Sequence, residues 1–161
     1  MAKLFLMSGP CGAGKTTLSH QLAEEYHLRY LGIEDFYAAF FGSELIHIHE
    51  DEVWEAFAIA IRCALEDEVD VIIDTNAPTR ADRQWFIDRF PGFEFHLVSV
   101  SAPREICRQN NAVRARVIPA KELESLYDAV EPVSEDEPFK TISFYENIDN
   151  SGLKLIRKLE H

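Results

Sequence analysis

The sequence predicts an α/β fold in which helices cover a parallel β-sheet, and three observations lead to this class. Short apolar runs of strand length alternate along the chain with segments whose apolar residues recur at helical spacing. A glycine-rich loop joins the first apolar run to the first helical segment. The 161 residues contain no internal repeat and no low-complexity linker, so we expect a single domain over residues 1–161.

Five buried strands are expected. The first, residues 3–8, is a short apolar run bounded by glycine, and the third, residues 69–74, is a continuous apolar run that ends on a carboxylate. The other three are apolar stretches at residues 29–33, 93–100 and 140–146. Because strands alternate with helices, a five-stranded parallel sheet is favoured.

Helices are predicted from apolar spacing and from residues that begin helices. Residues 50–67 give the clearest amphipathic pattern, and the segment from residue 79 to 90 opens with Thr79 and Asp82 as a capping box. The remaining helices are expected at residues 14–27, about 103–110, 119–130 with Pro119 in the first turn, and 151–160 at the end of the chain. Trp54 and Trp85 are assigned to the core.

Composition is that of an ordinary folded domain, with 47% hydrophobic and 27% charged residues. No apolar run approaches the roughly 18 residues of a membrane span, and three widely spaced cysteines fit a reducing compartment. We therefore expect a cytoplasmic protein without a membrane partner. The formal net charge of −12 gives no general attraction for nucleic acid.

The loop "GPCGAGKTT", residues 9–17, meets the pattern G-x-x-x-x-G-K-[ST] between a predicted strand and a predicted helix. Its glycines let successive backbone amides turn toward phosphate oxygens, and the helix adds its positive N-terminal end. This context disfavours a turn that merely connects two elements. We expect a P-loop NTPase three-layer sandwich that binds ATP and Mg²⁺. The nucleotide-binding residues are then Gly9, Cys11, Gly12, Ala13, Gly14, Lys15, Thr16 and Thr17, with Lys15 catalytic at the outer phosphates and Thr16 on the metal.

Two carboxylates follow predicted strands at the edge of the sheet where ligands bind in doubly wound folds. Asp35 is expected to accept the proton of an attacking hydroxyl; the alternative is that it caps a short helix over residues 36–41. Asp74 is expected to contact Mg²⁺ and the acceptor hydroxyl, with Asn76 adding an amide. In the alternative, Asp74 only ends its strand and hydrogen-bonds the turn.

Residues 103–121 hold five basic residues and one acid in an otherwise acidic chain: Arg104, Arg108, Arg114, Arg116 and Lys121 against Glu105. We expect a helical lid over about residues 103–130. From it, Arg114 would stabilise the transferring phosphoryl group and Arg108 would contact the nucleotide, because arginine suits phosphate recognition. The alternative is a solvated basic helix face.

Four segments resemble, in order, a family of P-loop kinases that includes the phage polynucleotide 5′-kinase domain and zeta-toxin-like proteins. They are "SGPCGAGKTTL", "EDFY", "VIIDTNAPTRADRQWF" and "RQNNAVRARVIPAKELESLY", and the resemblance covers about residues 3–130. It implies that Asp35 is the general base, that Asp74, Thr75 and Asn76 lie beside the acceptor, and that a lid arginine lies within residues 108–116. It also implies a nucleobase-binding loop near residues 143–149.

One departure from the family concerns the acceptor. Its nucleic-acid kinases carry an arginine three residues after the catalytic aspartate, where this chain has Ala38. Residues 46–52 and 122–137 are acidic and would repel a polynucleotide. We therefore expect an ATP- and Mg²⁺-dependent kinase acting on a hydroxyl of a small metabolite or nucleotide. A polynucleotide 5′-hydroxyl kinase, and a slow ATPase that serves as a nucleotide-dependent binding protein, are the alternatives.

Overall fold

The structure is a computed structural model and describes residues 1–115 and 117–161. Arg116, one of the basic residues of the predicted lid, lies outside the described residues. The strands are β1 (Lys3–Ser8), β2 (Arg29–Gly32), β3 (Val71–Asp74), β4 (Glu94–Ser101), β5 (Thr141–Glu146) and β6 (Lys154–Glu160). The helices are α1 (Lys15–Tyr26), α2 (Ile33–Phe41), α3 (Glu50–Glu66), α4 (Arg80–Arg89), α5 (Arg104–Ala112) and α6 (Ala120–Asp128).

The strands of the described residues form one six-stranded sheet in the order β2-β3-β1-β4-β5-β6. β1 to β5 run parallel as predicted, and β6 pairs antiparallel with β5. The predicted closing helix over residues 151–160 is therefore wrong, and so is the count of five strands. Leu155 and Ile156 are exposed, so burial of side chains does not decide the conformation of this segment. Its backbone pairing does, because β5 without β6 would be an open edge.

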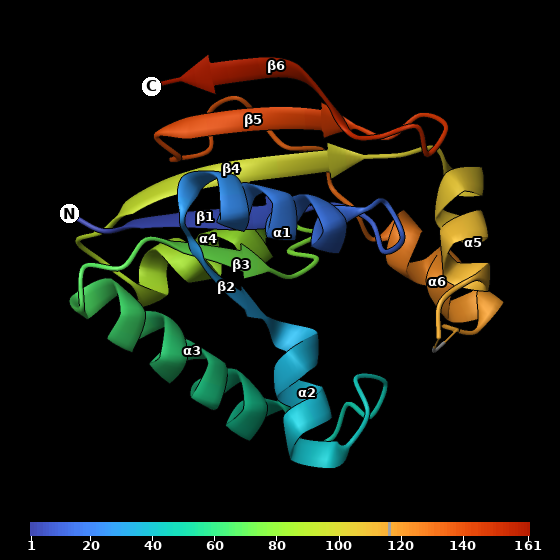
Figure 1. Cartoon of the computed structure of the whole chain (residues 1–161), viewed down its shortest axis with the longest axis horizontal. Helices are drawn as coiled ribbons and strands as arrows, with labels where there is room; N and C mark the ends of the chain where they lie inside the picture. The colour runs from blue at the N-terminus through green and yellow to red at the C-terminus, as the bar shows by residue number, and fades with distance from the viewer. Residues whose placement is uncertain (116) are drawn as a thin grey trace.

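Helices cover both faces of the sheet, which confirms the predicted three-layer sandwich (Figure 1). One core cluster packs α1 and α5 against the sheet through residues such as Leu18 and Leu22. A larger cluster holds α2, α3 and α4 on the other face, with Phe57, Ile61 and Phe86 among its buried side chains. The sheet is thus dry on both sides and gives the site a rigid base.

The C-terminal ends of the parallel strands lie at one edge of the sheet, and α5 and α6 stand beyond that edge (Figure 1). The loop of residues 9–14 follows β1, α2 begins directly after β2, and the loop of residues 75–79 follows β3. Because β1 lies between β3 and β4, the chain leaves the sheet in different directions on its two sides. Ligand crevices open at such switch points.

Two helix N-termini test the caps considered from the sequence. Thr79 Oγ1 accepts a hydrogen bond from Asp82 N and Thr79 N donates to the Asp82 carboxylate, so the predicted capping box is confirmed. α2 has Gly32 as its N-cap and no side-chain cap, so the alternative in which Asp35 caps this helix is wrong. Within the part of the chain that is described, every helix is too short or too polar to serve as a membrane span.

Candidate active site

The loop of residues 9–17 curls tightly because two of its glycines pack against neighbouring backbone. Gly9 has φ +151°, and a Cβ there would lie 2.2 Å from Val100 O. Gly12 has φ +84°, and a Cβ there would lie 2.7 Å from Cys107 O. Gly9 N also donates to Asn76 O at 3.0 Å, which joins this loop to the one that follows β3. The glycines therefore set the position of the loop as well as its curvature.

Lys15 begins α1 and is 6% exposed. Its Nζ donates to the carbonyl oxygen of Pro10 at 2.7 Å. Burial lowers the pKa of the Lys15 ammonium, while Cys11, Asp74 and Glu34 act in the opposite direction. A buried ammonium paired with a neutral carbonyl gains charge-assisted hydrogen bonds when phosphate oxygens replace that carbonyl.

Asp74 accepts two hydroxyl donors at the end of β3. Thr16 Oγ1 and Tyr30 OH each donate to its Oδ2 at 2.7 Å. Burial and the Asp74 carboxylate raise the pKa of the Tyr30 hydroxyl, so Tyr30 remains a donor at neutral pH. Mg²⁺ in nucleotide sites is held by one or two protein oxygen ligands together with phosphate oxygens. Thr16 and Asp74, the residues predicted for the metal, lie in contact and have the oxygen ligands that Mg²⁺ prefers.

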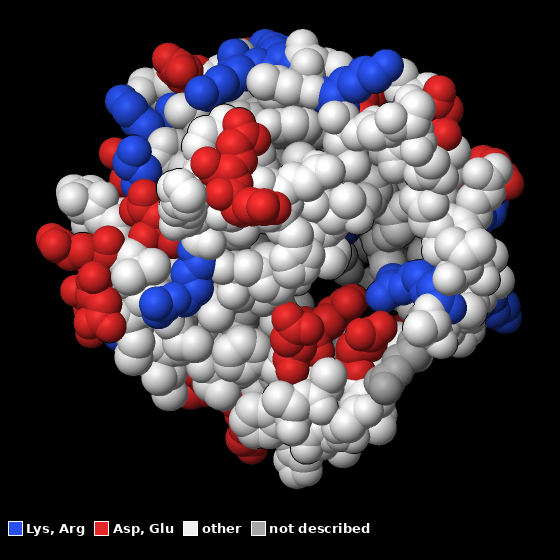
Figure 2. All heavy atoms as spheres, viewed as in Figure 1, with Lys and Arg blue, Asp and Glu red and all other residues white. Residues whose placement is uncertain are grey.

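A cavity of about 1360 Å³ starts at this loop and continues past Asp74 toward α3 and α4. After the ligands predicted for them from the sequence, we call its two parts the nucleotide half and the acceptor half. The nucleotide half is lined by the P-loop, by Asn110 and Arg114, and by the loop between β5 and β6. The acceptor half is lined by residues of α2, α3 and α4 and by the loops beside them. Figure 2 shows the hollow, with acidic side chains on one lip and basic side chains on the opposite lip.

Most of the predicted site residues line this cavity. They are Cys11, Gly12, Gly14, Lys15, Thr16, Thr17, Asp74, Asn76 and Arg114. Gly9 and Ala13 belong to the same loop but are buried and do not line the cavity. Trp54 packs against the core as the sequence predicts and also lines the acceptor half, whereas Trp85, assigned to the core from the sequence, lines that half and is 38% exposed.

The two adjacent carboxylates at the start of α2 differ in position. Glu34 lines the cavity, and Asp35 does not. Burial raises the pKa of Glu34, while Arg114 opposes this and Glu44 adds to it. The Asp35 carboxylate is near enough to help raise the pKa of Tyr30, whose hydroxyl contacts Asp74. Asp35 therefore lies at the margin of the crevice, and its role as general base stays a prediction.

The basic residues of the lid fall into two groups. Arg114 Nη1 lies 3.2 Å from Cys11 Sγ, and its Nη2 lies 3.4 Å from Glu44 and 3.5 Å from Glu34. This arginine thus bridges the P-loop and the acidic rim of the cavity. Arg108 lies outside the cavity lining and donates to Glu124 on α6 at 2.6 Å, so its contact with the nucleotide stays a prediction. In this structure, part of the basic run holds the two lid helices together.

Three asparagines that sequence reasoning did not assign connect the P-loop to the lid and to the β5–β6 loop. Asn110 Nδ2 donates to Gly12 O at 2.7 Å, and Asn147 Nδ2 donates to Ala13 O at 3.1 Å. Asn150 exchanges hydrogen bonds with Asn110 at 2.9 and 3.1 Å. The loop near residues 143–149, predicted as a nucleobase contact, therefore borders the nucleotide half. Its role in binding a base remains a prediction.

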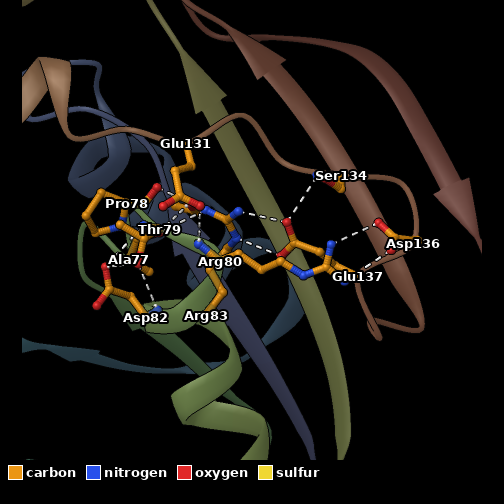
Figure 3. A network of polar contacts seen from close by, with 11 residues as sticks. Ala77, Pro78, Thr79, Arg80, Asp82, Arg83, Glu131, Ser134, Asp136 and Glu137 are labelled. Carbon is orange, nitrogen blue, oxygen red and sulfur yellow. Dashed lines mark hydrogen bonds and ion pairs between the residues drawn. The ribbon is translucent and has the colours of Figure 1, made fainter.

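A buried ion pair fixes the loop that carries Asn76 (Figure 3). Arg83 on α4 donates from Nε and Nη2 to the Glu137 carboxylate, each at 2.7 Å, and both side chains are almost fully buried. Arg83 Nη1 also reaches the carbonyl oxygens of Ala77 and Pro78 at 3.3 and 3.2 Å. The loop after β3 is thereby joined to the segment that follows the lid. The partners are 54 residues apart, so no local sequence pattern could have paired them.

The sequence profile of a family described as an AAA domain (AAA_33) matches residues 4–133. No curated protein gives a significant match to the sequence. Among solved structures, a sugar kinase from Janibacter sp. HTCC2649 superposes with a TM-score of 0.66 at 20% identity, over 91% of this chain and 85% of that one. Kti12 from Chaetomium thermophilum, solved with ADP-AlF3, gives 0.69 at 16% identity, over 92% and 90%.

The Pnkp1/Rnl/Hen1 RNA repair complex gives a TM-score of 0.71 at 19% identity. This match covers 80% of the present chain but 44% of the other, so the likeness extends over less than half of that protein's chain. At identities this low, the superpositions show a shared fold.

Proposed function

The chain belongs to the AAA domain family (AAA_33), and from that membership and the geometry of the site we propose that it is an ATP- and Mg²⁺-dependent kinase. It transfers the γ-phosphate of ATP to the hydroxyl group of a small-molecule acceptor. The observation that supports this most directly is the division of the cavity. Its volume of about 1360 Å³ exceeds the roughly 300–1000 Å³ typical of a single-ligand pocket, and a second half extends beyond the phosphate-binding loop.

The nucleotide is bound by the P-loop. Its backbone amides and the N-terminus of α1 face the phosphates, and Lys15 exchanges the Pro10 carbonyl for their outer oxygens. Thr16 and Asp74 would hold Mg²⁺ together with phosphate oxygens, and the cation supplies neutralisation of the phosphate charge. Arg114, which already spans from the P-loop to the acidic rim, stabilises the negative charge on the group in transfer.

Phosphoryl transfer joins the acceptor oxygen to the γ-phosphorus while the bond from that phosphorus to the bridging oxygen breaks and ADP leaves. The proton of the acceptor hydroxyl passes to a carboxylate. From the family resemblance, we propose that Asp35 accepts this proton. Glu34, which lines the cavity, orients the acceptor. A general base need not contact the cavity before the acceptor is bound, since catalytic hydrogen bonds often tighten only in the complex.

A polynucleotide acceptor is disfavoured by the same site. α2 carries Ala38 where the family's nucleic-acid kinases have an arginine, and the acceptor half is rich in carboxylates. A chain of phosphates would meet like charge on entering it. The sugar kinase among the solved structures also supports a small hydroxyl compound as the acceptor.

The test is transfer of the γ-phosphate from labelled ATP to a panel of alcohols, nucleosides and oligonucleotides, with free phosphate measured in parallel. We expect labelled phosphate on a small alcohol, and loss of both transfer and ATP binding in Lys15→Ala. Release of free phosphate alone, at the same rate with and without any acceptor, would instead indicate a nucleotide-hydrolysing binding protein.

A further inference from the structure

We propose that the acceptor is an alcohol that also carries an ammonium group, and that it carries no phosphate or carboxylate. This inference rests on the proposed kinase function and narrows the chemistry of its second substrate. It is supported by the charge of the acceptor half, by its aromatic walls and by the residue at position 38.

Carboxylates dominate the acceptor half and come from several elements. Among the described residues that line it, seven are acidic and two are arginines, because Arg114, which also borders the nucleotide half, reaches Glu34 and Glu44 from the lid side. The acids are Glu34, Glu44, Glu50, Asp51, Glu55, Asp74 and Asp82. Anionic walls of this kind attract a cation and repel an anionic ligand.

Several of these carboxylates form ion pairs, whereas Glu50 and Asp51 form none with the described residues. Arg89 Nη2 lies 2.5 Å from Glu55, and Arg114 contacts the two glutamates Glu34 and Glu44. Among the described residues, neither Glu50 nor Asp51 forms an ion pair, although both line the cavity. They occupy the first turn of α3, where the helix dipole favours anions. The equivalent of roughly half a positive charge at a helix N-terminus cannot balance two carboxylates.

Aromatic side chains stand beside these acids. Trp54 and Trp85 meet edge to face at 5.6 Å between ring centroids, whereas Tyr37 in the same half is buried and its ring is stacked on His47. An ammonium group over an aromatic face is attracted by the electron-rich ring, and carboxylates nearby strengthen the attraction. A neutral polyol would use the rings but would leave the carboxylate charge uncompensated.

α2 brings no cation to the acceptor half at the position where the family's nucleic-acid kinases have an arginine. Ala38 on α2 has no charge, and Arg89, at the far wall, is engaged by Glu55. Among the described residues that line the acceptor half, the two arginines already contact glutamates, Arg89 through Nη2 with its Nε left without a partner, and Arg114 at 3.4 and 3.5 Å. The charge pattern selects the ammonium compound.

Binding can be measured without catalysis, because both tryptophans of the chain lie in the acceptor half. Their fluorescence is titrated in the presence of Mg²⁺ and a non-hydrolysable ATP analogue, with matched alcohols that differ in charge. The sets are glucosamine, glucose and gluconate, and ethanolamine, ethylene glycol and glycolate. We expect the ammonium member of a set to bind at least tenfold more tightly than its neutral counterpart and the anionic member not to bind. Higher salt should weaken the binding of the ammonium member alone.

The variant Glu50→Gln/Asp51→Asn should raise the dissociation constant of the ammonium compound by about tenfold and leave that of the neutral one unchanged. Glu52→Gln is the matched control, since Glu52 lies in the same turn of α3 but does not line the cavity. It should bind both compounds like the unchanged chain.

Equal responses to the ammonium and neutral members, or none to the ammonium members, would overturn the inference. So would equal effects of the double variant and of Glu52→Gln. A failure of the proposed function gives a different result. Labelled phosphate would then reach no acceptor, whichever of the alcohols binds most tightly.

Discussion

Replacing Glu137 by leucine should destabilise the protein severely, because it removes the counter-charge of a buried arginine. Arg83 would keep weak contacts to the carbonyls of Ala77 and Pro78 but lose two hydrogen bonds of 2.7 Å to a carboxylate. Removing one partner of a buried ion pair costs about 3–5 kcal/mol. For a chain of this size, each kcal/mol lowers the melting temperature by roughly 2–4 °C, so we expect a fall of about 6–20 °C.

The assay is thermal and urea unfolding followed by circular dichroism. Asp136→Ala is the matched control, because Asp136 pairs with Arg80 in the same network but both of these side chains are well exposed. A solvent-exposed pair contributes little to stability, so this variant should unfold at the same midpoint as the unchanged protein. The variant Arg83→Met/Glu137→Leu should recover much of the loss, since an apolar pair leaves no buried charge.

Equal unfolding midpoints for Glu137→Leu and Asp136→Ala would refute this reasoning. The network would then be a consequence of the fold instead of a support for the loop after β3. A double variant as unstable as the single one would also contradict it, because the cost would then come from lost packing and not from an unpaired charge.

Three further predictions concern catalysis and pH. Asp35→Asn should lower kcat by about 10²–10⁴ with the KM for ATP unchanged, while Glu34→Gln should mainly raise the KM for the acceptor; the reverse result would make Glu34 the base. Arg114→Ala should lower kcat by about a hundredfold or more, and Arg108→Ala should not, since Arg108 is bound to α6. Equal losses of kcat in steady-state assays of the two variants would contradict the different roles given to these lid arginines. Burial lowers the pKa of His96, so its contribution to stability is present above pH ~6.5 and is lost as the pH falls below it. His96→Asn should flatten the decline in urea midpoint between pH 7.5 and 5, and an unchanged decline would refute this.

The features predicted correctly from the sequence are those determined by neighbouring residues or by a repeated pattern. The capping box at Thr79 and Asp82 needs residues three apart, and the P-loop pattern lies within nine residues. The contact between Thr16 and Asp74 spans 58 residues, but it follows once two parallel strands end beside each other. Local chemistry and the order of strands therefore give the phosphate-binding part of the site.

The features that were missed depend on contacts between distant segments. The hydrogen bond of Asn110 to Gly12 spans 98 residues and the pair of Arg83 with Glu137 spans 54. The sequence of β6 predicts a helix because its side chains give no clear alternation, whereas its conformation is set by backbone pairing with β5. Aromatic character alone does not distinguish a cavity wall from a core, so the sequence places Trp85 in the core.

The distribution of charge in the cavity explains how one acidic protein can admit two substrates to one site. ATP is an anion, and a chain with a formal net charge of −12 repels it over most of its surface. Lys15 and Arg114 make the nucleotide half an exception, whereas Glu50 and Asp51 keep the acceptor half anionic. On the proposed function, this contrast directs the triphosphate away from the acceptor half and the ammonium alcohol away from the phosphate loop. Each substrate is then excluded from the place of the other before any shape-specific contact forms.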